Sequence, residues 1–243
     1  MAIPLILKPK KKYELLRLGR NFDGGYLVGT DSLKKSEILI SLGICDDWTF
    51  EKDFRFINNK CLIFCYDEKL IPNFLIKKFF KSIFFFRKFS FLKYFYLLID
   101  LYKARIFKKI NFIKKKISYN DLNQILNKLS SSDIFLKIDI EGSEYRLLDE
   151  ILLNQDRFLG LVIEFHDFDY HKSTICNFVE KLNLTLVHIH PNNYSFININ
   201  NDPNVLEFTF ERNPKIIGDN NYLPHELDMN NNPFGSTVRL NFE

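Results

Sequence analysis

The chain has 243 residues, of which 46% are hydrophobic and 26% charged, and its formal net charge is +4. This length and composition exclude an intrinsically disordered chain and fit one α/β domain with an insertion, or two small domains. Four cysteines with neither zinc-site spacing nor a disulfide framework predict a cytoplasmic protein. The amino terminus lacks signal-peptide order, and no run is apolar for the 18 or so residues that a transmembrane helix needs.

Apolar runs that predict strands alternate with helical patterns along the chain. The predicted strands are 37–44, 61–67, 111–118, the first part of 135–148, 160–168, 184–190 and 204–213. The predicted helices are 49–59, 121–129, the second part of 135–148, and 171–182. Such alternation is typical of a mostly parallel sheet covered on both faces. The last two runs have no helix between them, which predicts that those strands pair antiparallel.

The segment from Leu70 to Ile110 differs from the rest of the chain. It holds ten Lys or Arg residues, a single acidic residue and ten of the 26 phenylalanines. Read as one helix, 74–93 is apolar in nearly every direction and must pack against its own domain, a second subunit or an anionic bilayer surface. We expect a homodimer, with peripheral contact at the inner face of the membrane as the alternative. Nucleic-acid binding is not expected, because the aromatic residues are predicted to be buried.

Polar residues follow five of the predicted strands, at the edge where ligands gather in a parallel sheet. They are Gly43 with Asp46 and Asp47; Asp67; Asp139 with Glu141; Glu164 with His166 and Asp167; and His190 with Asn192 and Asn193. One such group is explained by a helix cap. Five at the same edge predict a ligand site.

The stretch FLKIDIEGSEYRLL, residues 135–148, carries four ionisable side chains where a strand becomes a helix. Glu144 belongs in the first helical turn, where the helix dipole favours a carboxylate. Lys137, Asp139 and Glu141 alternate along the strand and therefore share one face. A Lys–Asp pair that satisfies itself at the strand end is one explanation. A ligand site at the sheet edge is the other.

The charge of the first loop indicates which cofactor such a site would take. Asp67 ends the second strand, where a carboxylate can hold the hydroxyls of an adenosine ribose. The loop SLGICDDWTFE, residues 41–51, has one glycine and several carboxylates, and negative charge would repel a dinucleotide pyrophosphate. The sulfonium and ammonium groups of S-adenosylmethionine tolerate acidic neighbours. The loop therefore favours S-adenosylmethionine.

These motifs resemble the FkbM-type methyltransferases, a branch of the class I S-adenosylmethionine-dependent enzymes. The likeness rests on RNFDGGYLV, SLGICDDWTFE, CYD, FLKIDIEGSEYRLL, VIEFHDF, VHIHPNNYSF and PNVLEFTFER, with the block KIDIEGSE the most specific. The resemblance implies a Rossmann-like, seven-stranded, mostly parallel sheet with an antiparallel last strand. It implies one domain over 1–243, with a Phe/Lys-rich helical insertion at about 70–110 after the second strand.

The resemblance also implies roles for individual residues. Gly43 would let the backbone approach the cofactor, Asp67 would hold the ribose, and Asp139 would lie between cofactor and acceptor. Asp46 or Glu51 would lie near the amino acid end of the cofactor. The turn formed by Asp23, Gly24 and Gly25 either folds over the cofactor or is a tight turn before the first strand.

We expect O-methylation of a sugar, either a sugar nucleotide or a sugar of a capsule or other glycan. His166 is the predicted general base, with Asp139 second. The residues expected to bind the acceptor are Glu141, Glu164, His190, Asn192 and Asn193. His188 and His190 with Glu164, His166 and Asp167 could also supply a divalent metal site, which we do not favour. The alternatives are N-methylation of a small amino-phosphate compound and a non-catalytic binding module.

Overall fold

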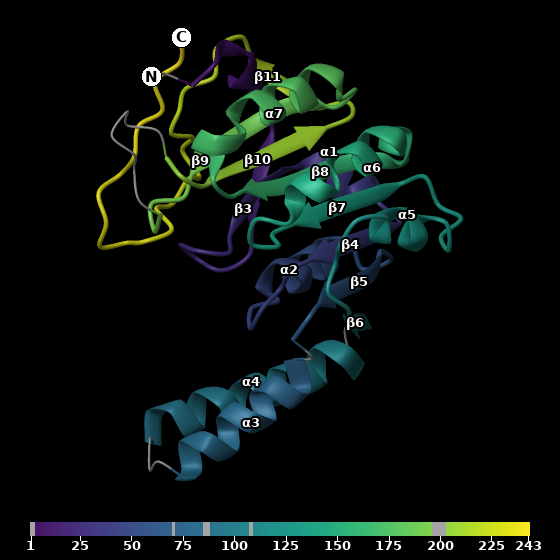
Figure 1. Cartoon of the computed structure of the whole chain (residues 1–243), viewed down its shortest axis with the longest axis vertical. Coiled ribbons are helices and arrows are strands. Elements are labelled where there is room, and N and C mark those ends of the chain that lie inside the picture. Colours follow the sequence, from purple (N-terminus) through teal and green to yellow (C-terminus); the bar gives the residue numbers. More distant parts are fainter. Residues whose placement is uncertain (1–2, 70, 85–87, 107–108, 196–202) are drawn as a thin grey trace.

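The computed structural model describes residues 3–69, 71–84, 88–106, 109–195 and 203–243. Its centre is a seven-stranded sheet in the order β6-β5-β4-β7-β8-β10-β9 (Figure 1). The strands are β4 (Ile38–Leu42), β5 (Leu62–Asp67), β6 (Ile110–Lys114), β7 (Ile134–Ile138), β8 (Phe158–Phe165), β9 (Thr185–Pro191) and β10 (Leu206–Glu211). Strand β10 runs antiparallel to both β8 and β9, and the pairs from β6 to β8 are parallel. The predicted sheet, with its antiparallel last strand, is confirmed.

Both faces of the sheet are covered because its strands are apolar on both sides. Within β4, Ile38 and Ile40 belong to one hydrophobic core and Leu39 to the other. The first core packs against α5 (Asp121–Leu126), α6 (Leu148–Leu153) and α7 (Phe168–Lys181). The second core packs against α1 (Thr30–Lys35) and α2 (Thr49–Ile57). Because the strands from β6 to β8 are parallel, their carboxyl ends lie at the same edge of the sheet. The loops at this edge lie outside the two cores and can carry polar residues.

Segments from both ends of the chain pack around the sheet. The antiparallel strands β2 (Leu15–Leu18) and β3 (Tyr26–Gly29) form a hairpin over the second core. Strand β1 (Lys12–Tyr13) pairs with β11 (Ile216–Gly218), and Ile3 forms a bridge with Phe242, so the two ends lie side by side (Figure 1). The tail after β11 is irregular, and Leu223, Leu240 and Phe242 pack it on the first core.

The Phe/Lys-rich insertion is helical, as predicted, and forms two helices, α3 (Ile71–Phe84) and α4 (Lys88–Ile106), where the sequence was read as one helix over 74–93. They pack against each other as a hairpin that projects from the sheet (Figure 1). At the base, Leu101 and Ala104 enter the second core and Asp100 bonds Lys52 of α2 at 2.8 Å. Phe85, Phe86 and Arg87 lie outside the described residues. No helix among those described is long and apolar enough to cross a membrane.

The projecting hairpin leaves large aromatic side chains in water. Phe80, Tyr96 and Tyr102 are each more than 60% exposed, which is costly at roughly 25 cal/mol per Å² of apolar area. We expect light scattering to show a homodimer, and Phe80→Ser with Tyr96→Ser to weaken it. Tyr170→Ser, at an equally exposed tyrosine on α7, is the control. A monomer that also fails to float with anionic vesicles would contradict this prediction.

A buried carboxylate joins β10 to the amino-terminal hairpin. Glu211 is 1% exposed, and its Oε1 accepts hydrogen bonds from Gly29 N at 2.9 Å and Ser32 Oγ at 2.6 Å. A side chain at Gly29 has no room, because its Cβ would lie 2.3 Å from Glu211 Cδ. Burial raises the pKa of Glu211 from 4.5 to about 7. The native state therefore favours the protonated carboxyl.

Glu211→Gln is expected to stabilise the protein above neutral pH, because it keeps the acceptor oxygen and removes a buried charge. The parent's free energy of unfolding should fall as pH rises from about 4.5 through about 7, since the native pKa lies above the unfolded one. Urea unfolding should show the variant more stable at about pH 8, by on the order of 2 kcal/mol, with a flatter pH profile.

Glu14→Gln is the control for this comparison, because Glu14 bonds Thr30 and the exposed Lys215, which lower its pKa. That variant should gain no stability at high pH. Parallel pH profiles for Glu211→Gln and the parent would contradict the role given to Glu211.

Candidate active site

A cavity of about 490 Å³ lies at the carboxyl ends of β4, β5 and β7. The residues that line it include Gly24, Gly43, Asp46, Asp67, Asp139 and Glu141. They come from the amino-terminal hairpin and from the loops after the three strands. Three of the five polar groups that the sequence predicts at this edge therefore line one cavity.

Gly43 permits the ends of β4 and β7 to meet. Its φ is +79°, and a Cβ there would lie 1.6 Å from the carbonyl oxygen of Asp139. A backbone hydrogen bond joins the two strand ends, since Asp139 N donates to Leu42 O at 2.9 Å. Only glycine adopts this conformation and leaves that space. The close approach that requires Gly43 is to the protein's own backbone, and its predicted contact with a cofactor stays a prediction.

Asp67 fixes the loop that follows β4. Its Oδ2 accepts hydrogen bonds from the amides of Ile44 and Cys45 at 3.1 and 3.0 Å, and its Oδ1 accepts one from Lys69 N at 2.7 Å. The side chain is half-buried and lines the cavity. Each carboxylate oxygen has two lone pairs, so acceptor capacity remains for a ribose diol. Asp67 thus shapes the cavity, and its predicted ribose contact remains open to test.

Lys137 and Glu51 form a buried pair beneath the cavity. Lys137 Nζ donates to Gly43 O at 3.2 Å and lies 3.9 Å from Glu51 Oε1, which also accepts a 2.5 Å hydrogen bond from Ser41 Oγ. Glu51 is 0% exposed, and burial raises its pKa. The structure therefore does not place Glu51 at the cavity surface, where the sequence put it beside the cofactor. Lys137 pairs with Glu51 rather than with Asp139.

Tyr26, which the sequence analysis did not single out, joins two carboxylates at the edge of the cavity. Its hydroxyl lies 3.2 Å from Asp139 Oδ2 and 3.1 Å from Glu164 Oε2. Asn192 Nδ2 donates to the other oxygen of Glu164 at 3.0 Å. Tyr26 directly follows the turn DGG. From the sequence alone, a tyrosine that contacts a site cannot be distinguished here from one that packs in the core.

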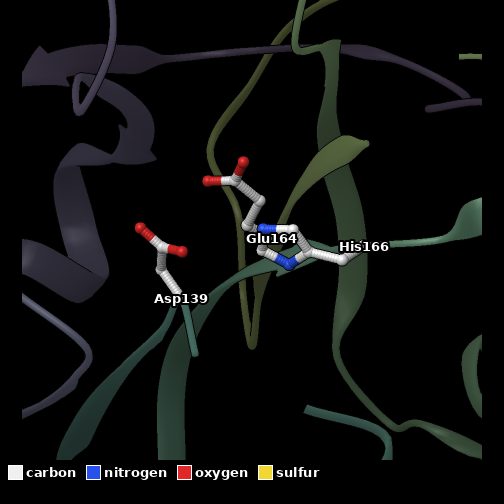
Figure 2. Close-up of side chains that lie close together, drawn as sticks. All are labelled: Asp139, Glu164 and His166. Atoms are coloured by element: carbon white, nitrogen blue, oxygen red, sulfur yellow. The ribbon is translucent and has the colours of Figure 1, made fainter. Parts of the chain in front are cut away.

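A glutamate orients His166 toward these carboxylates. Glu144 Oε1 accepts hydrogen bonds from His166 N at 2.7 Å and from His166 Nδ1 at 3.1 Å. Glu144 is 0% exposed and belongs to a short 3-10 turn, η2 (Glu144–Arg146). From the sequence, the helix dipole alone explains Glu144. In the structure Glu144 also binds His166. Ligand atoms of Asp139, Glu164 and His166 all lie within 4.8 Å of one another (Figure 2).

The charges in this group strongly perturb one another. Burial raises the pKa of Glu164 well above its ordinary value, and the charge of Asp139 raises it further. Burial alone would lower the pKa of His166, but the hydrogen bond and charge of Glu144, with Glu164 and Asp139, raise it to about 9. The group formed by Asp139, Glu164 and His166 is called the acidic cluster below.

The structure brings most of the predicted site residues to this edge. Those lining the cavity are Asp23, Gly24, Gly43, Asp46, Asp67, Asp139 and Glu141. Glu164 and His166 lie beside Asp139, and Asn192 contacts Glu164. Gly25 is buried, and a Cβ there would lie 2.4 Å from Arg17. Asn193 instead donates to the carbonyls of Asn232 and Ser236 in the tail.

His188 and His190 do not join Glu164, His166 and Asp167 in one site. Asp228 of the carboxyl-terminal tail lies 3.0 Å from His188 Nε2 and 3.5 Å from His190 Nδ1. His190 also lies 3.1 Å from Asn231. All these side chains are buried, so the histidines attach the tail to β9. The acceptor contact predicted for His190 has no support in this geometry.

Solved structures similar to this chain include several methyltransferases. A fibrillarin from Methanococcus jannaschii covers 74% of this chain and 68% of its own, with 12% identity and a TM-score of 0.42. An rRNA methylase from Streptococcus thermophilus covers 74% and 92%, with 14% identity and a TM-score of 0.41. A precorrin-6y C5,15-methyltransferase from Geobacter metallireducens covers 75% and 85%, with 11% identity and a TM-score of 0.39. No curated protein sequence matches the chain.

The family comparison is specific. Residues 100–196 match the family model described as a methyltransferase FkbM domain. The match begins in α4 and includes Asp139, Glu164, His166 and Asn192, so it contains the whole acidic cluster. The sheet has the seven strands and the antiparallel last strand that the resemblance implies. Residues 100–196 are therefore similar to an FkbM methyltransferase domain, which agrees with the resemblance of the motifs and with the form of the sheet.

Proposed function

We propose that the protein transfers a methyl group from S-adenosylmethionine to a hydroxyl group of a sugar. The observation that carries the proposal is the position of Asp139. Its side chain lines the cavity and also belongs to the acidic cluster. One carboxylate therefore separates a space suited to a cofactor from a polar group suited to an acceptor.

The residues of the cavity fit S-adenosylmethionine in size and charge. A volume of about 490 Å³ lies in the range of small-molecule sites, roughly 300–1,000 Å³. Asp67 offers acceptor oxygens to a diol, while Asp46 and Asp47 offer negative charge toward an ammonium group. Part of that charge is balanced, since Asp47 pairs with Arg20 at 3.1 Å and Asp46 lies 3.8 Å from Lys93. When bound, the cofactor supplies an electrophilic methyl group on a sulfonium.

The acidic cluster is suited to a polyol acceptor. Asp139 and Glu164 present acceptor oxygens to hydroxyl groups, and Glu141, 86% exposed, adds another at the rim. His166 adds an imidazole within reach of both carboxylates. Like charge would repel a phosphate placed against these groups, which disfavours the amino-phosphate alternative. A sugar hydroxyl would meet complementary partners here.

Transfer to a hydroxyl requires a proton acceptor as well as alignment. The hydroxyl oxygen takes the methyl group in an in-line displacement and gives its proton to a neighbouring base. His166, in its neutral form, and Asp139 are the two groups predicted for this step, and a positioned base contributes roughly 10²–10⁴-fold. Tyr26 holds Asp139 at the cavity edge, so that the acceptor oxygen meets both groups together.

Asp67→Ala is expected to weaken S-adenosylmethionine binding by at least ~1.5 kcal/mol, the scale of a lost hydrogen bond to a charged group. Isothermal titration calorimetry with S-adenosylmethionine and S-adenosylhomocysteine measures the loss. Asp149→Ala, at an exposed carboxylate on α6, is the matched control and should bind like the parent. If the parent binds neither compound, the enzyme reading fails and a binding module becomes the better description.

Asp139→Asn is expected to reduce turnover by a factor of at least ~10², the scale of a lost base, with little change in melting temperature. The amide keeps the size of the side chain and removes its charge. Turnover is measured by mass spectrometry of sugar nucleotides and glycan sugars incubated with S-adenosylmethionine. Methylation of an amine but of no hydroxyl in such a screen would contradict the proposed acceptor.

A further inference from the structure

The acidic cluster is built from the ends of two neighbouring strands and has a defined shape. Asp139 follows β7, while Glu164 lies in β8 and His166 follows it (Figure 2). Glu164 is 6% exposed, Asp139 and His166 are half-buried, and Asp139 also lines the cavity. It offers two carboxylate oxygens and one imidazole nitrogen toward a common space.

Glu144 determines which imidazole nitrogen faces the cluster. Because Nδ1 lies 3.1 Å from its buried carboxylate, Nδ1 carries a proton and donates it. Glu144 is fixed in turn by Gly142 N, which donates to its other oxygen at 2.9 Å. When the ring loses its other proton, as it must to bind a metal ion, the lone pair lies on Nε2, which also lies 3.5 Å from Glu141 Oε2. A carboxylate behind a histidine is the arrangement that orients metal-ligating imidazoles.

The hydroxyl of Tyr26 cannot donate to both of the carboxylates beside it. It has one proton, yet it lies 3.2 Å from an oxygen of Asp139 and 3.1 Å from an oxygen of Glu164. One of these two oxygens therefore receives no hydrogen bond from it. Lys137 donates to neither of these oxygens, since its ammonium donates to Gly43 O and lies near Glu51. Two carboxylates converge in a low-dielectric site with one shared proton between them.

We propose that Asp139, Glu164 and His166 form the binding site of a divalent metal ion. Carboxylate oxygens together with one imidazole nitrogen suit Mn²⁺ and the neighbouring transition metals better than Ca²⁺ or Mg²⁺, which prefer oxygen alone. An ion roughly 2.1 Å from each ligand atom would hold those atoms roughly 3–4 Å apart, so small rotations suffice to close the present spread of 4.8 Å. The two carboxylates neutralise the ion.

Three protein ligands leave coordination positions on the side of the cavity. If the protein methylates a hydroxyl, as proposed above, the ion would orient that hydroxyl beside Asp139 and make its proton easier to lose. Only this role rests on the proposed function. The binding of the ion rests on the three side chains and on Glu144.

Metal binding is tested on the full chain after treatment with a chelator, with Mn²⁺ as the probe. Electron paramagnetic resonance of free Mn²⁺ is expected to show one ion bound per chain. Glu164→Gln and His166→Gln should each weaken binding at least tenfold. Glu207→Gln is the matched control, because it is an equally buried glutamate paired with Glu164 across β8 and β10 but bonded to Asn231.

Circular dichroism melting separates loss of the site from loss of the fold. The parent should melt at a higher temperature with Mn²⁺ than without, and the Glu207→Gln variant should show the same shift. If neither glutamate variant folds, Asp139→Asn gives the same comparison. No Mn²⁺ bound by the parent, or equal binding by parent and cluster variants, would overturn the inference.

The outcome is independent of that of the proposed function. Binding of S-adenosylhomocysteine by a chain that takes up no Mn²⁺ would overturn the metal site alone. Uptake of Mn²⁺ at the cluster, with no sugar methylated under any condition, would overturn the proposed acceptor and leave the metal site standing.

Discussion

The site depends on one close contact, between the backbone at Gly43 and the carbonyl oxygen of Asp139. No side chain fits between them, since a Cβ at Gly43 would lie 1.6 Å from that oxygen. The contact joins the ends of β4 and β7 and presents Gly43 O to Lys137. Asp67 then fixes the following loop through the amides of Ile44 and Cys45. The cavity walls are thus consequences of how two strands end.

Buried negative charge is the second constraint on this edge of the sheet. Glu164 and Glu207 face each other across β8 and β10, and both are nearly inaccessible to water. Burial raises the pKa of both groups, that of Glu207 to about 7. Such carboxylates are costly for stability unless a partner compensates them. The placement of Glu164 beside Asp139 is better explained by binding than by folding.

The sequence predicts the fold well because periodicity and strand order are local signals. Apolar runs such as 37–44 locate the strands of the sheet within a few residues. The missing helix between the last two runs predicts their antiparallel pairing. The insertion was harder, since a continuous run of Phe and Lys does not show where α3 ends and α4 begins.

The site could be predicted only in part. Asp67 and Asp139 follow strands, so the sheet places them at its edge whatever the side chains do. Glu51 was misplaced because its loop continues into α2, whose buried face turns the carboxylate toward Lys137. His190 was misplaced because its imidazole contacts Asp228, which lies 38 positions later in the chain. Tyr26 was missed because its partners, Asp139 and Glu164, are more than 100 residues away.

A crystal structure of the protein with S-adenosylhomocysteine and Mn²⁺ tests the central claim most directly. We expect the ribose at Asp67, the sulfur directed toward Asp139, and an anomalous peak between Asp139, Glu164 and His166. Cofactor density elsewhere on the surface, or in the cavity with its sulfur turned away from the acidic cluster, would contradict the claim that Asp139 separates the cofactor from the acceptor.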